Sequence, residues 1–305
     1  MKKALITGSQ GFVGSYLRRE LEEHGYAVTG LDLQTGDDVI VADLLDGDVL
    51  KTVIAQEQPD MIFHLAGQAN VRKSWEFPRE TIAQNVIATI NLMEAVRHEK
   101  PECRMVLVGS SEQYGNLGEA GKLVDETLAT HPQTPYAVSK KAQEEMASIY
   151  VKAYELNISM TRSFNHAGAG QGKGFLIPDF ASGIVAVERG QQPCLRVGNL
   201  TARRDFTHVR DVVRAYRLIA EKGRAGEVYN VGSGITYSAR EILDKLCDLA
   251  QCPIAVCQDP AKLRPSDTPV ICCDHRKLTD HTGWQPEVSM DEILKEVMAY
   301  WRERQ

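Results

Sequence analysis

The strongest constraint on the fold is a glycine-rich turn between a short apolar run and a helical pattern at the start of the chain. Ala4–Ile6 predicts a strand and Phe12–His24 predicts a helix, and they are joined by glycines at positions 8, 11 and 14. Glycines there allow a tight turn, so that backbone amides at the helix start can approach a pyrophosphate. The spacing differs from Gly-x-Gly-x-x-Gly, yet its strand and helix context predicts a dinucleotide site.

Short apolar runs and helical patterns continue to alternate through the first half of the chain. Such alternation predicts βαβ units, which build a doubly wound parallel sheet of the Rossmann type with helices on both faces. We therefore expect an α/β fold. Beyond the first pair of elements, the expected strands are Ala27–Leu31, Met61–Phe63, Met105–Val108 and Ile158–Arg162. The expected helices are Val49–Gln56, Glu80–Glu99 and Ala137–Leu156.

The pattern loosens after about residue 165, where glycine-rich turns and prolines become frequent. We expect residues 1–165 to form the Rossmann domain that binds NAD(P), with some later segments returning to it. Residues 166–305 are expected to form a smaller α/β domain for the substrate. Its predicted elements are the strand Val228–Val231 and the helices Phe180–Glu188, Val212–Glu221, Ala239–Ala250 and Met290–Arg302.

The composition limits the classes of partner. The chain has 305 residues, 43% of them hydrophobic, and a formal net charge of -6 at pH 7. It therefore offers no basic surplus for nucleic acid or an anionic membrane. The first apolar stretch is shorter than a signal peptide or a membrane span, so we expect a cytoplasmic protein. The seven cysteines lack paired Cys-x-x-Cys spacing, which predicts reduced thiols, with neither a disulfide framework nor a zinc site.

Two acidic positions are candidates for contacts with the adenosine part of the cofactor. Asp32 ends the second predicted strand, where a carboxylate would accept hydrogen bonds from the adenosine ribose and repel a 2′-phosphate. This favours NAD(H) over NADP(H), although NADP(H) stays possible, and the alternative is a solvated aspartate at a strand end. Asp43 and Leu44 follow the next apolar run and are expected beside adenine, with a simple loop as the alternative.

Tyr136 and Lys140 are separated by three residues at the start of a predicted helix, so their side chains project from one face a turn apart. A phenol is a weak acid–base group near neutrality, but an adjacent ammonium lowers its pKa. Tyr136 can then exchange a proton with a substrate hydroxyl or carbonyl, while Lys140 also holds the nicotinamide ribose. Because such pairs are common on helix surfaces, the prediction depends on their neighbours.

The segment Ser110–Gly115 supplies those neighbours. It follows a predicted buried strand at the carboxyl edge of the sheet, where open α/β sheets bind ligands. Ser110 is placed to hydrogen-bond a substrate oxygen, and Glu112 is a second acid–base candidate. A carboxylate that only fixes the loop is the alternative for Glu112. The predicted catalytic set is therefore Ser110, Glu112, Tyr136 and Lys140.

Several stretches together resemble the extended short-chain dehydrogenases/reductases, the NAD-dependent epimerase/dehydratase family that modifies nucleotide sugars. The resemblance extends over essentially the whole chain and rests on Thr7–Gly14, His64–Gly67, Asn85–Val86, Ser110–Gly115, Tyr136–Lys140, Arg162–Asn165 and Arg204–Asp211. It implies a nicotinamide-dependent enzyme with a nucleotide-sugar substrate. The cofactor residues that the motifs and the resemblance indicate are Gly8, Gln10, Gly11, Phe12, Val13, Gly14, Asp32, Asp43, Leu44, Leu65, Ala66, Gly67, Asn85, Tyr136 and Lys140.

The diphosphate of a nucleotide sugar needs cationic partners, and guanidinium groups bind phosphate oxygens in a bidentate way. Arg204 and Arg264 are the candidates, with a surface salt bridge as the alternative for each. The resemblance and the position of a short apolar run add further substrate contacts: Ser111, Asn165 at the phosphates, Asp267 at the nucleotide ribose, and Val197–Asn199, whose backbone would face the base.

Two residues ahead of the predicted helix Val212–Glu221 have structural as well as functional interpretations. Asp211 is placed to cap that helix, which we favour over a catalytic role. His208 would either close the substrate pocket or pack as a buried histidine. Neither is included in the predicted site.

Within the family the chain resembles most the enzymes that reduce GDP-4-keto-6-deoxy-D-mannose to GDP-D-rhamnose or its carbon 4 epimer. The alternative is GDP-mannose 4,6-dehydratase, or another nucleotide-sugar epimerase or dehydratase. Residues 167–174 lack the arginine pair of the dehydratases, and the chain is shorter, which favours the reductase. Glu112 favours the dehydratase, because dehydration needs a base for the carbon 5 proton.

Two further implications concern class and assembly. A protein that senses NAD(H) without turnover is the non-enzymatic alternative, and it would not need the predicted catalytic set. The family resemblance implies a homodimer through the helices near residues 81–99 and 137–156, or a tetramer built from that dimer.

Overall fold

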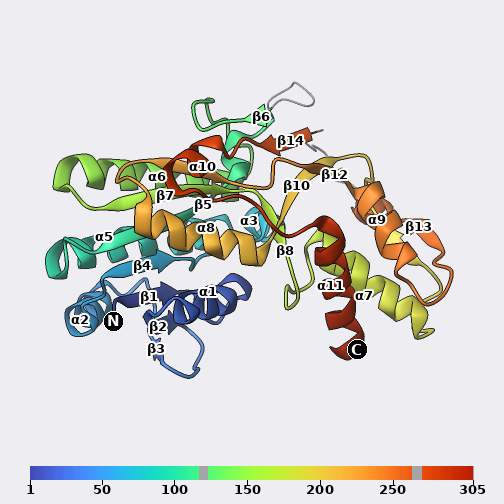
Figure 1. Ribbon diagram of the computed structural model, residues 1–305, viewed down its shortest axis with the longest axis horizontal. Helices are drawn as coiled ribbons and strands as arrows, with labels where there is room; N and C mark the ends of the chain where they lie inside the picture. Colours follow the sequence, from blue (N-terminus) through green and yellow to red (C-terminus); the bar gives the residue numbers. More distant parts are fainter. Residues whose placement is uncertain (117–122, 263–269, 305) are drawn as a thin grey trace.

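Short aliphatic runs form the seven-stranded sheet of the larger part of the molecule (Figure 1). The computed structural model describes residues 1–116, 123–262 and 270–304. The sheet has the order β11-β7-β5-β4-β1-β2-β3, and each neighbouring pair is parallel. Its strands are β1 (Lys3–Thr7), β2 (Ala27–Asp32), β3 (Val39–Val41), β4 (Met61–His64), β5 (Arg104–Ser110), β7 (Ile158–Ser163) and β11 (Val228–Val231).

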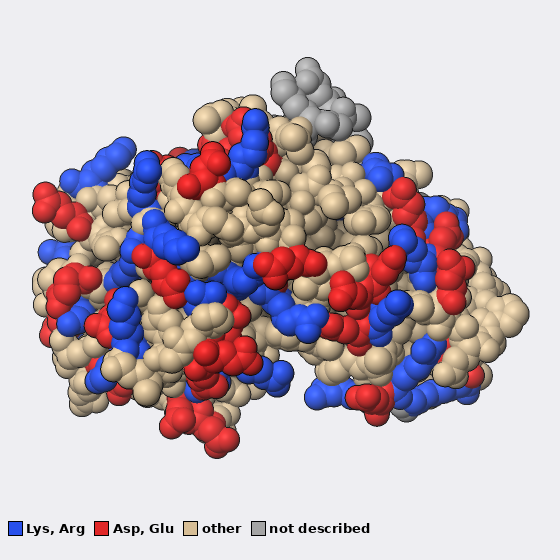
Figure 2. Space-filling view, in the orientation of Figure 1, with Lys and Arg blue, Asp and Glu red and all other residues tan. Residues whose placement is uncertain are grey.

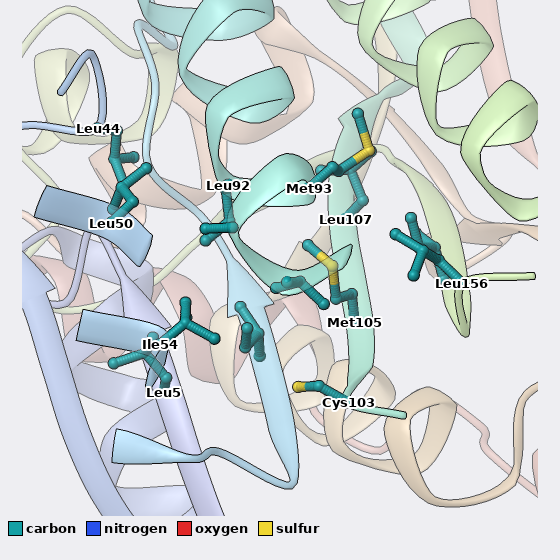
Figure 3. Close-up of a cluster of buried hydrophobic side chains, with 14 of the residues drawn as sticks. Leu5, Leu44, Leu50, Ile54, Leu92, Met93, Cys103, Met105, Leu107 and Leu156 are labelled. Carbon is teal, nitrogen blue, oxygen red and sulfur yellow. The ribbon is translucent and has the colours of Figure 1, made fainter. Parts of the chain in front are cut away.

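Helices cover both faces of this sheet, because alternate residues of its strands point to opposite sides. Leu5 packs toward one face, where Leu50, Ile54 and Leu92 close the core (Figure 3). Ile6 packs toward the other face. The first face is covered by α2 (Gly47–Glu57), α5 (Ala88–Glu99) and α6 (Pro135–Tyr154), and the second by α1 (Phe12–Glu23) and α8 (Val209–Lys222).

The strand order reverses between β1 and β4, because the chain runs outward from β1 to β2 and β3 and then returns to β4 on the other side. Carboxyl ends of strands at such a switch point form the crevice in which open α/β sheets bind ligands. The predicted Rossmann fold is therefore confirmed, and it places the glycine-rich turn after β1 directly at this crevice.

The smaller part is built around β10 (Arg203–His208), which pairs with three strands. A separate apolar cluster fills the space between its helices. The remaining strands are β6 (Leu123–Val124), β8 (Asn165–Ala167), β9 (Leu195–Val197), β12 (Thr236–Ser238), β13 (Val256–Gln258) and β14 (Val270–Cys273). The helices are α7 (Leu176–Glu188), α9 (Ala239–Asp248), α10 (Arg276–Thr282), α11 (Met290–Arg304) and the 3-10 turn η3 (Pro260–Lys262).

The assignment of Val228–Val231 and Val212–Glu221 to the smaller domain is wrong, because the strand is β11, at the edge of the large sheet, and the helix lies within α8, which packs on that sheet. Both follow residue 165 in the sequence, so this part of the chain returns to the first fold unit. A domain boundary between residues 165 and 166 stays a prediction.

The predicted helix Glu80–Glu99 is wrong as one continuous helix. The chain forms α4 (Pro78–Ile82), a π-helical turn η1 (Ala83–Ile87) and then α5. Single π-turns occur frequently at functional sites, because the extra residue redirects a side chain. Here the turn contains Asn85, which is fully buried and hydrogen-bonded to two other segments. Two more short elements are α3 (Val71–Glu76), which follows β4, and the 3-10 turn η2 (Ser111–Tyr114), which directly follows β5.

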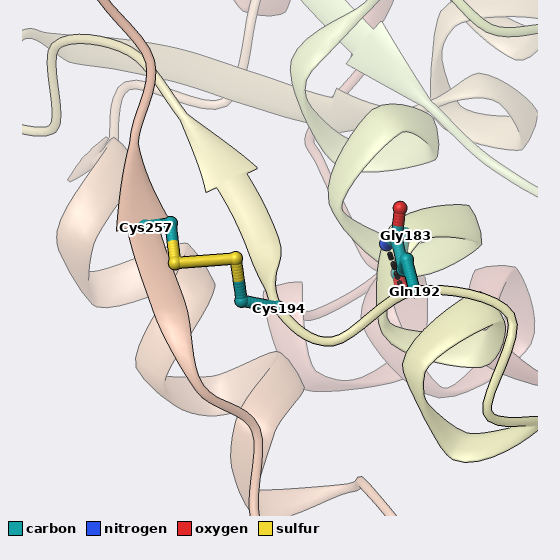
Figure 4. Close-up of a disulfide and its surroundings, with 4 residues drawn as sticks. All are labelled: Gly183, Gln192, Cys194 and Cys257. Carbon is teal, nitrogen blue, oxygen red and sulfur yellow. Dashed lines mark hydrogen bonds between the residues drawn. A yellow bond between two sulfur atoms is a disulfide. The ribbon is translucent and has the colours of Figure 1, made fainter.

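The prediction that all thiols are reduced is wrong for one pair, because Cys194 and Cys257 form a disulfide (Figure 4). Their Cα atoms lie 6.1 Å apart although 63 positions separate them in the sequence. The parallel pairing of β9 with β13 brings them together, and no spacing rule in the sequence reveals that pairing. The other five cysteines are free thiols.

Acidic and basic side chains are mixed on the viewed face of the molecule, and the surface is hollowed between the two parts (Figure 2). None of the helices in the described residues is both long and apolar enough to span a membrane.

Candidate functional site

The glycine-rich turn forms a close-packed cradle at the end of β1. Gly8 has a φ of +73°, and a Cβ there would lie 2.9 Å from the Ala66 backbone. A Cβ on Gly14 would lie 2.5 Å from the Gly8 carbonyl oxygen. Gly11 is the N-cap of α1 and makes no side-chain cap hydrogen bond. The first amides of α1, at Phe12 and Val13, are therefore left for an anionic group, and this cradle fits the pyrophosphate of a dinucleotide.

Asp32 lies at the carboxyl end of β2, beside the glycine-rich turn. Its Oδ2 accepts a hydrogen bond of 2.9 Å from the Gln10 amide, and its Oδ1 accepts one of 3.1 Å from the Gln34 amide. The carboxylate is thus held in place at the predicted ribose position. Asp43 is exposed, whereas the Leu44 side chain is buried in the core, so only backbone groups of Leu44 are available to a ligand.

Leu65, Ala66 and Gly67 follow β4 and pack directly beside the glycine-rich turn, at Gly8. Gly67 has a φ of +147°, and a Cβ there would lie 2.5 Å from Oδ1 of Asn85. Asn85 accepts a hydrogen bond from the Gln68 amide and donates to the Ser139 hydroxyl. Its side chain therefore ties the Gly67 turn to α6, which is a supporting role for a residue predicted to bind the cofactor directly.

Tyr136 is positioned by the start of α6. The Thr134 hydroxyl caps this helix by accepting a hydrogen bond from the Ala137 amide, and Pro135 occupies the first helical position. Burial raises the pKa of Tyr136 to about 12, against a hydrogen bond with Ser110 that lowers it, and the nearby Glu112 raises it further. The structure therefore brings together Ser110 at the end of β5, Glu112 in η2 and Tyr136 of α6.

The expectation that Lys140 lowers the pKa of Tyr136 is wrong for this arrangement. The Lys140 ammonium donates hydrogen bonds to the Val108 carbonyl, at 2.9 Å, and to Oε1 of Gln143, at 3.0 Å. Burial dominates at Tyr136 and keeps the phenol protonated across the neutral range. A protonated phenol can donate a proton to an oxygen that becomes negative during a reaction.

A buried ion pair that sequence reasoning missed supports the Ser110 turn. The Ser110 amide donates to Oε1 of Gln113, and Nε2 of Gln113 donates to Glu144 at 2.7 Å. Glu144 in turn accepts two hydrogen bonds from Arg162, at 2.9 and 2.7 Å. Gln113 and Arg162 belong to the family stretches Ser110–Gly115 and Arg162–Asn165, but nothing in the sequence indicates that Glu144 joins them.

The predicted substrate residues lie on the side of the smaller part. Asn165 is exposed on β8 and pairs in register with Phe206 of β10. Arg204 lies on β10, where its guanidinium donates to the Arg203 carbonyl. The Val197 side chain is buried and its carbonyl accepts a hydrogen bond from Asp259. Ser111 is buried in η2, whereas the predicted residues Arg264 and Asp267 lie outside the described residues.

The prediction that Asp211 caps a helix at Val212 is wrong. The helix α8 begins at Val209, and the His208 side chain caps it by accepting from the Arg210 amide. Asp211 lies inside the first turn, where its Oδ2 accepts from the amides of Glu287 and Val288, each at 2.9 Å. This carboxylate therefore anchors the segment before α11.

Of the two roles predicted for His208, the structure shows the packed, buried histidine. Its Nε2 lies 2.9 Å from a carboxylate oxygen of Glu296. Asp205, in the same strand, was missed by sequence reasoning as a structural residue. It is buried and accepts hydrogen bonds from the backbone amides of Ser233, Gly234 and Cys273. Both side chains hold the smaller part together.

Comparison with known proteins identifies the family of this arrangement. A family model described as GDP-mannose 4,6 dehydratase matches residues 5–297. The chain belongs to this family. It is therefore a member of the extended short-chain dehydrogenases/reductases, and it is an NAD(P)-dependent enzyme that modifies nucleotide sugars.

Among sequence relatives, the chain is 34% identical over 304 residues to the GDP-6-deoxy-D-mannose reductase of Pseudomonas aeruginosa, covering 99% of this chain and 98% of that protein. It is 27% identical over 349 residues to a GDP-mannose 4,6-dehydratase of Vibrio cholerae, covering 98% of this chain and 93% of that protein.

Two solved structures have the same fold. RMD from Pseudomonas aeruginosa, complexed with NADPH, has a TM-score of 0.91 and 33% identity, covering 100% of both chains. UDP-glucose 4-epimerase from Thermus thermophilus, complexed with NAD, has a TM-score of 0.87 and 28% identity, covering 98% of this chain and 99% of that one. The predicted family resemblance is thus confirmed.

Proposed function

We propose that the protein reduces the 4-keto group of GDP-4-keto-6-deoxy-D-mannose and forms GDP-D-rhamnose or its carbon 4 epimer. The observation that carries this proposal is the protonated Tyr136 hydroxyl, hydrogen-bonded to Ser110 at the carboxyl end of β5. Such a pair can hold a carbonyl oxygen and protonate it. The 34% identity to a GDP-6-deoxy-D-mannose reductase supports the same reaction and substrate.

In the proposed reaction the bound reduced nicotinamide supplies a hydride to carbon 4 of the sugar. The residues of the chain supply orientation and the proton. Ser110 and Tyr136 hold the keto oxygen by hydrogen bonds, and Tyr136 gives its proton to that oxygen as the alkoxide forms. The Lys140 ammonium lies one helical turn from Tyr136, where it would hold the nicotinamide ribose. Burial lowers the pKa of Lys140 to about 8, so most of it is still charged at neutral pH.

For substrate binding, we propose that Asn165 and Arg204 hold the diphosphate and that the segment Val197–Asn199 faces the base. Positions 165 and 204 lie on the neighbouring strands β8 and β10, both in the smaller part. The cradle of Gly8, Gly11 and Gly14 lies across from them at the end of β1, and we infer that it binds the cofactor.

The second candidate function is GDP-mannose 4,6-dehydratase, because Glu112 lies close enough to Tyr136 to raise the pKa of its phenol. A carboxylate in this place can remove the carbon 5 proton of a 4-keto sugar. The 27% identity to a GDP-mannose 4,6-dehydratase is consistent with this alternative.

The stoichiometry of the cofactor tests the proposal. We expect one reduced nicotinamide to be oxidised for each GDP-4-keto-6-deoxy-D-mannose consumed, with GDP-mannose left unchanged. A dehydratase takes a hydride from carbon 4 and returns it to carbon 6, so it shows no net change in nicotinamide. Absorbance of the reduced cofactor and mass spectrometry of the sugar nucleotide distinguish the two reactions.

The variant Glu112→Gln sharpens this test, because it removes a base while keeping the size of the side chain. Ketone reduction should slow only modestly, with Glu145→Gln on the surface of α6 as the matched control. If the wild-type protein converts GDP-mannose to the 4-keto sugar without added NADH, and Glu112→Gln abolishes this, the dehydratase is the correct function.

We further propose that NAD(H) is preferred over NADP(H), because Asp32 presents a carboxylate where a 2′-phosphate would lie. Among the relatives, the Pseudomonas structure is complexed with NADPH and the Thermus structure with NAD. The wild-type protein should have a higher kcat/KM with NADH than with NADPH. Asp32→Ser should reduce that ratio by about tenfold to a hundredfold, the value of a hydrogen bond to a charged group.

The control for this prediction is Asp37→Ser, which removes an exposed carboxylate from the same loop. It should change the NADH to NADPH ratio far less than Asp32→Ser. A wild-type preference for NADPH in steady-state kinetics would contradict the assignment of Asp32.

We infer a homodimer from apolar side chains that are exposed on neighbouring helices. Ile82 of α4, Ile87 of η1, and Val138 and Ile149 of α6 have exposed fractions between 37% and 54%, and α4 and η1 both contact α6. Light scattering coupled to size-exclusion chromatography should give twice the mass of the chain for a dimer, or twice the dimer mass for a tetramer built from it. The variant Ile149→Glu should shift this mass toward the monomer.

A further inference from the structure

A chain of buried hydrogen bonds runs from β1 to α6, the helix that carries Tyr136 and Lys140. The Thr7 hydroxyl lies 2.7 Å from Nδ1 of His64, and Nε2 of His64 lies 2.9 Å from the Thr89 hydroxyl. Nε2 of Gln143 lies 3.0 Å from the same Thr89 oxygen, and Oε1 of Gln143 lies 3.0 Å from the Lys140 ammonium. All five side chains are buried.

The direction of each hydrogen bond in this chain is fixed by one hydroxyl. Thr89 donates its single proton to the Asn85 carbonyl, at 2.7 Å, because a carbonyl can only accept. The Thr89 oxygen must therefore accept from both His64 and Gln143. His64 carries its proton on Nε2 and accepts the Thr7 proton at Nδ1. The amide of Gln143 is likewise fixed, with its nitrogen toward Thr89 and its oxygen toward Lys140.

The groups around Lys140 decide how much the side-chain carbonyl oxygen of Gln143 contributes to holding the ammonium. His64, on β4, faces Lys140 without charge, because burial and the nearby ammonium lower the pKa of His64 to about 3. On α6 itself, Tyr136 stays protonated and Glu144 is paired with Arg162. Its two hydrogen-bond partners in the described residues, Gln143 and the Val108 carbonyl, are both neutral dipoles.

We propose that Gln143 is a positioning residue whose side-chain carbonyl, oriented by Thr89 and His64, holds the Lys140 ammonium beside the reaction site. The glutamine acts through Lys140 and lies behind it, so it is not itself a catalytic residue. The kinetic consequence rests on the proposed function of Tyr136 and Lys140, whereas the positioning of the ammonium can be measured in the free protein.

Two substitutions at one position should move the proton affinity of Lys140 in opposite directions. Gln143→Met keeps the length of the side chain but removes the acceptor, so Lys140 should lose its proton at lower pH. Gln143→Glu places a negative acceptor beside the ammonium, so Lys140 should lose its proton at higher pH, by about one pH unit or more. A carboxylate at position 143 raises the proton affinity of Lys140 whatever the native role of Gln143, so Gln143→Met is the deciding variant: a glutamine that only fills space would give no shift in it.

The test is competitive acetylation of the free protein with acetic anhydride over a pH series, with Lys140 resolved from Lys141 by tandem mass spectrometry. The wild-type midpoint is expected near the pKa of Lys140, about 8, with opposite shifts in the two variants. Thr89→Val should shift it downward, because the Gln143 amide is then free to turn. Glu145→Gln, on the exposed side of α6, should leave it unchanged.

A Gln143→Met midpoint equal to that of the wild-type protein would overturn the proposal, even if Gln143→Glu shifts upward. The same shifts should appear in the pH dependence of NADH binding, measured by fluorescence, and this second readout decides the matter if buried Lys140 reacts too slowly with the reagent. Opposite shifts in a protein that lacks reductase activity would support the role of Gln143 while contradicting the proposed function.

Discussion

Replacing Tyr136 by Phe should lower the turnover number by about two to four orders of magnitude, which is the usual contribution of a positioned general acid. The substitution removes only the hydroxyl, and the ring can keep its buried packing against α6 and β5. Burial holds the pKa of the phenol at about 12, so at neutral pH the wild-type side chain carries the proton that the alkoxide needs. Without it, water must supply that proton, and water is held less well in the site.

The matched control for this prediction is Tyr154→Phe near the end of the same helix, where the ring is half exposed and lies 4.7 Å from the Arg97 guanidinium. Its turnover number should stay close to that of the wild-type protein. NADH affinity, measured by fluorescence titration, should fall far less than the turnover number in Tyr136→Phe. Retention of most of the activity by purified Tyr136→Phe would show that another group is the main proton donor.

Residues of the crevice that belong to local patterns could be predicted from the sequence. Tyr136 and Lys140 follow from helical spacing, and Gly8 follows from a turn that directly joins a strand to a helix. The position of Ser110 follows from the rule that ligands bind at the carboxyl ends of parallel strands. In each case the pattern and its physical cause lie within a few residues of one another.

Features that depend on distant pairing could not be predicted in this way. Glu144 meets Arg162 across a helix–strand contact, and Cys194 meets Cys257 only because β9 pairs with β13. The π-turn at Asn85 is likewise invisible to a 3.6-residue pattern, because it changes the backbone without changing the residue types. The way distant elements pack against one another decides such features, and composition and spacing do not specify it.

The ion pair of Arg162 and Glu144 is the most consequential of these distant contacts for stability. Both side chains are less than one-tenth exposed, and they share two hydrogen bonds. Burial alone would raise the pKa of Glu144, but the hydrogen bonds from Arg162 and Gln113 lower it below its ordinary value. The guanidinium also lies over the ring of Tyr114, at 4.8 Å. The pair therefore joins α6, β7 and the turn that carries Ser110.

Replacing Arg162 by Met should lower the free energy of unfolding by about 3 to 5 kcal/mol, because it leaves the Glu144 charge buried without its partner. The double variant Arg162→Met, Glu144→Met should regain much of this loss, since apolar side chains need no counter-charge there. Chemical denaturation followed by circular dichroism measures both values. A single variant as stable as the wild-type protein would mean that Glu144 finds another partner or takes up a proton without cost.

The pH dependence of the same measurement separates a charge effect from a packing effect. Because the folded-state pKa of Glu144 lies below its ordinary value, the ion pair contributes fully above the pKa of the unfolded chain and less as the pH falls through the folded-state value. The difference in stability between the wild-type protein and Arg162→Met should therefore be largest near neutral pH and shrink in acid, where Glu144 is protonated in the variant. A difference that stays constant with pH would assign the loss to the missing packing of Arg162 against Tyr114, since that contact does not require an ionised carboxylate.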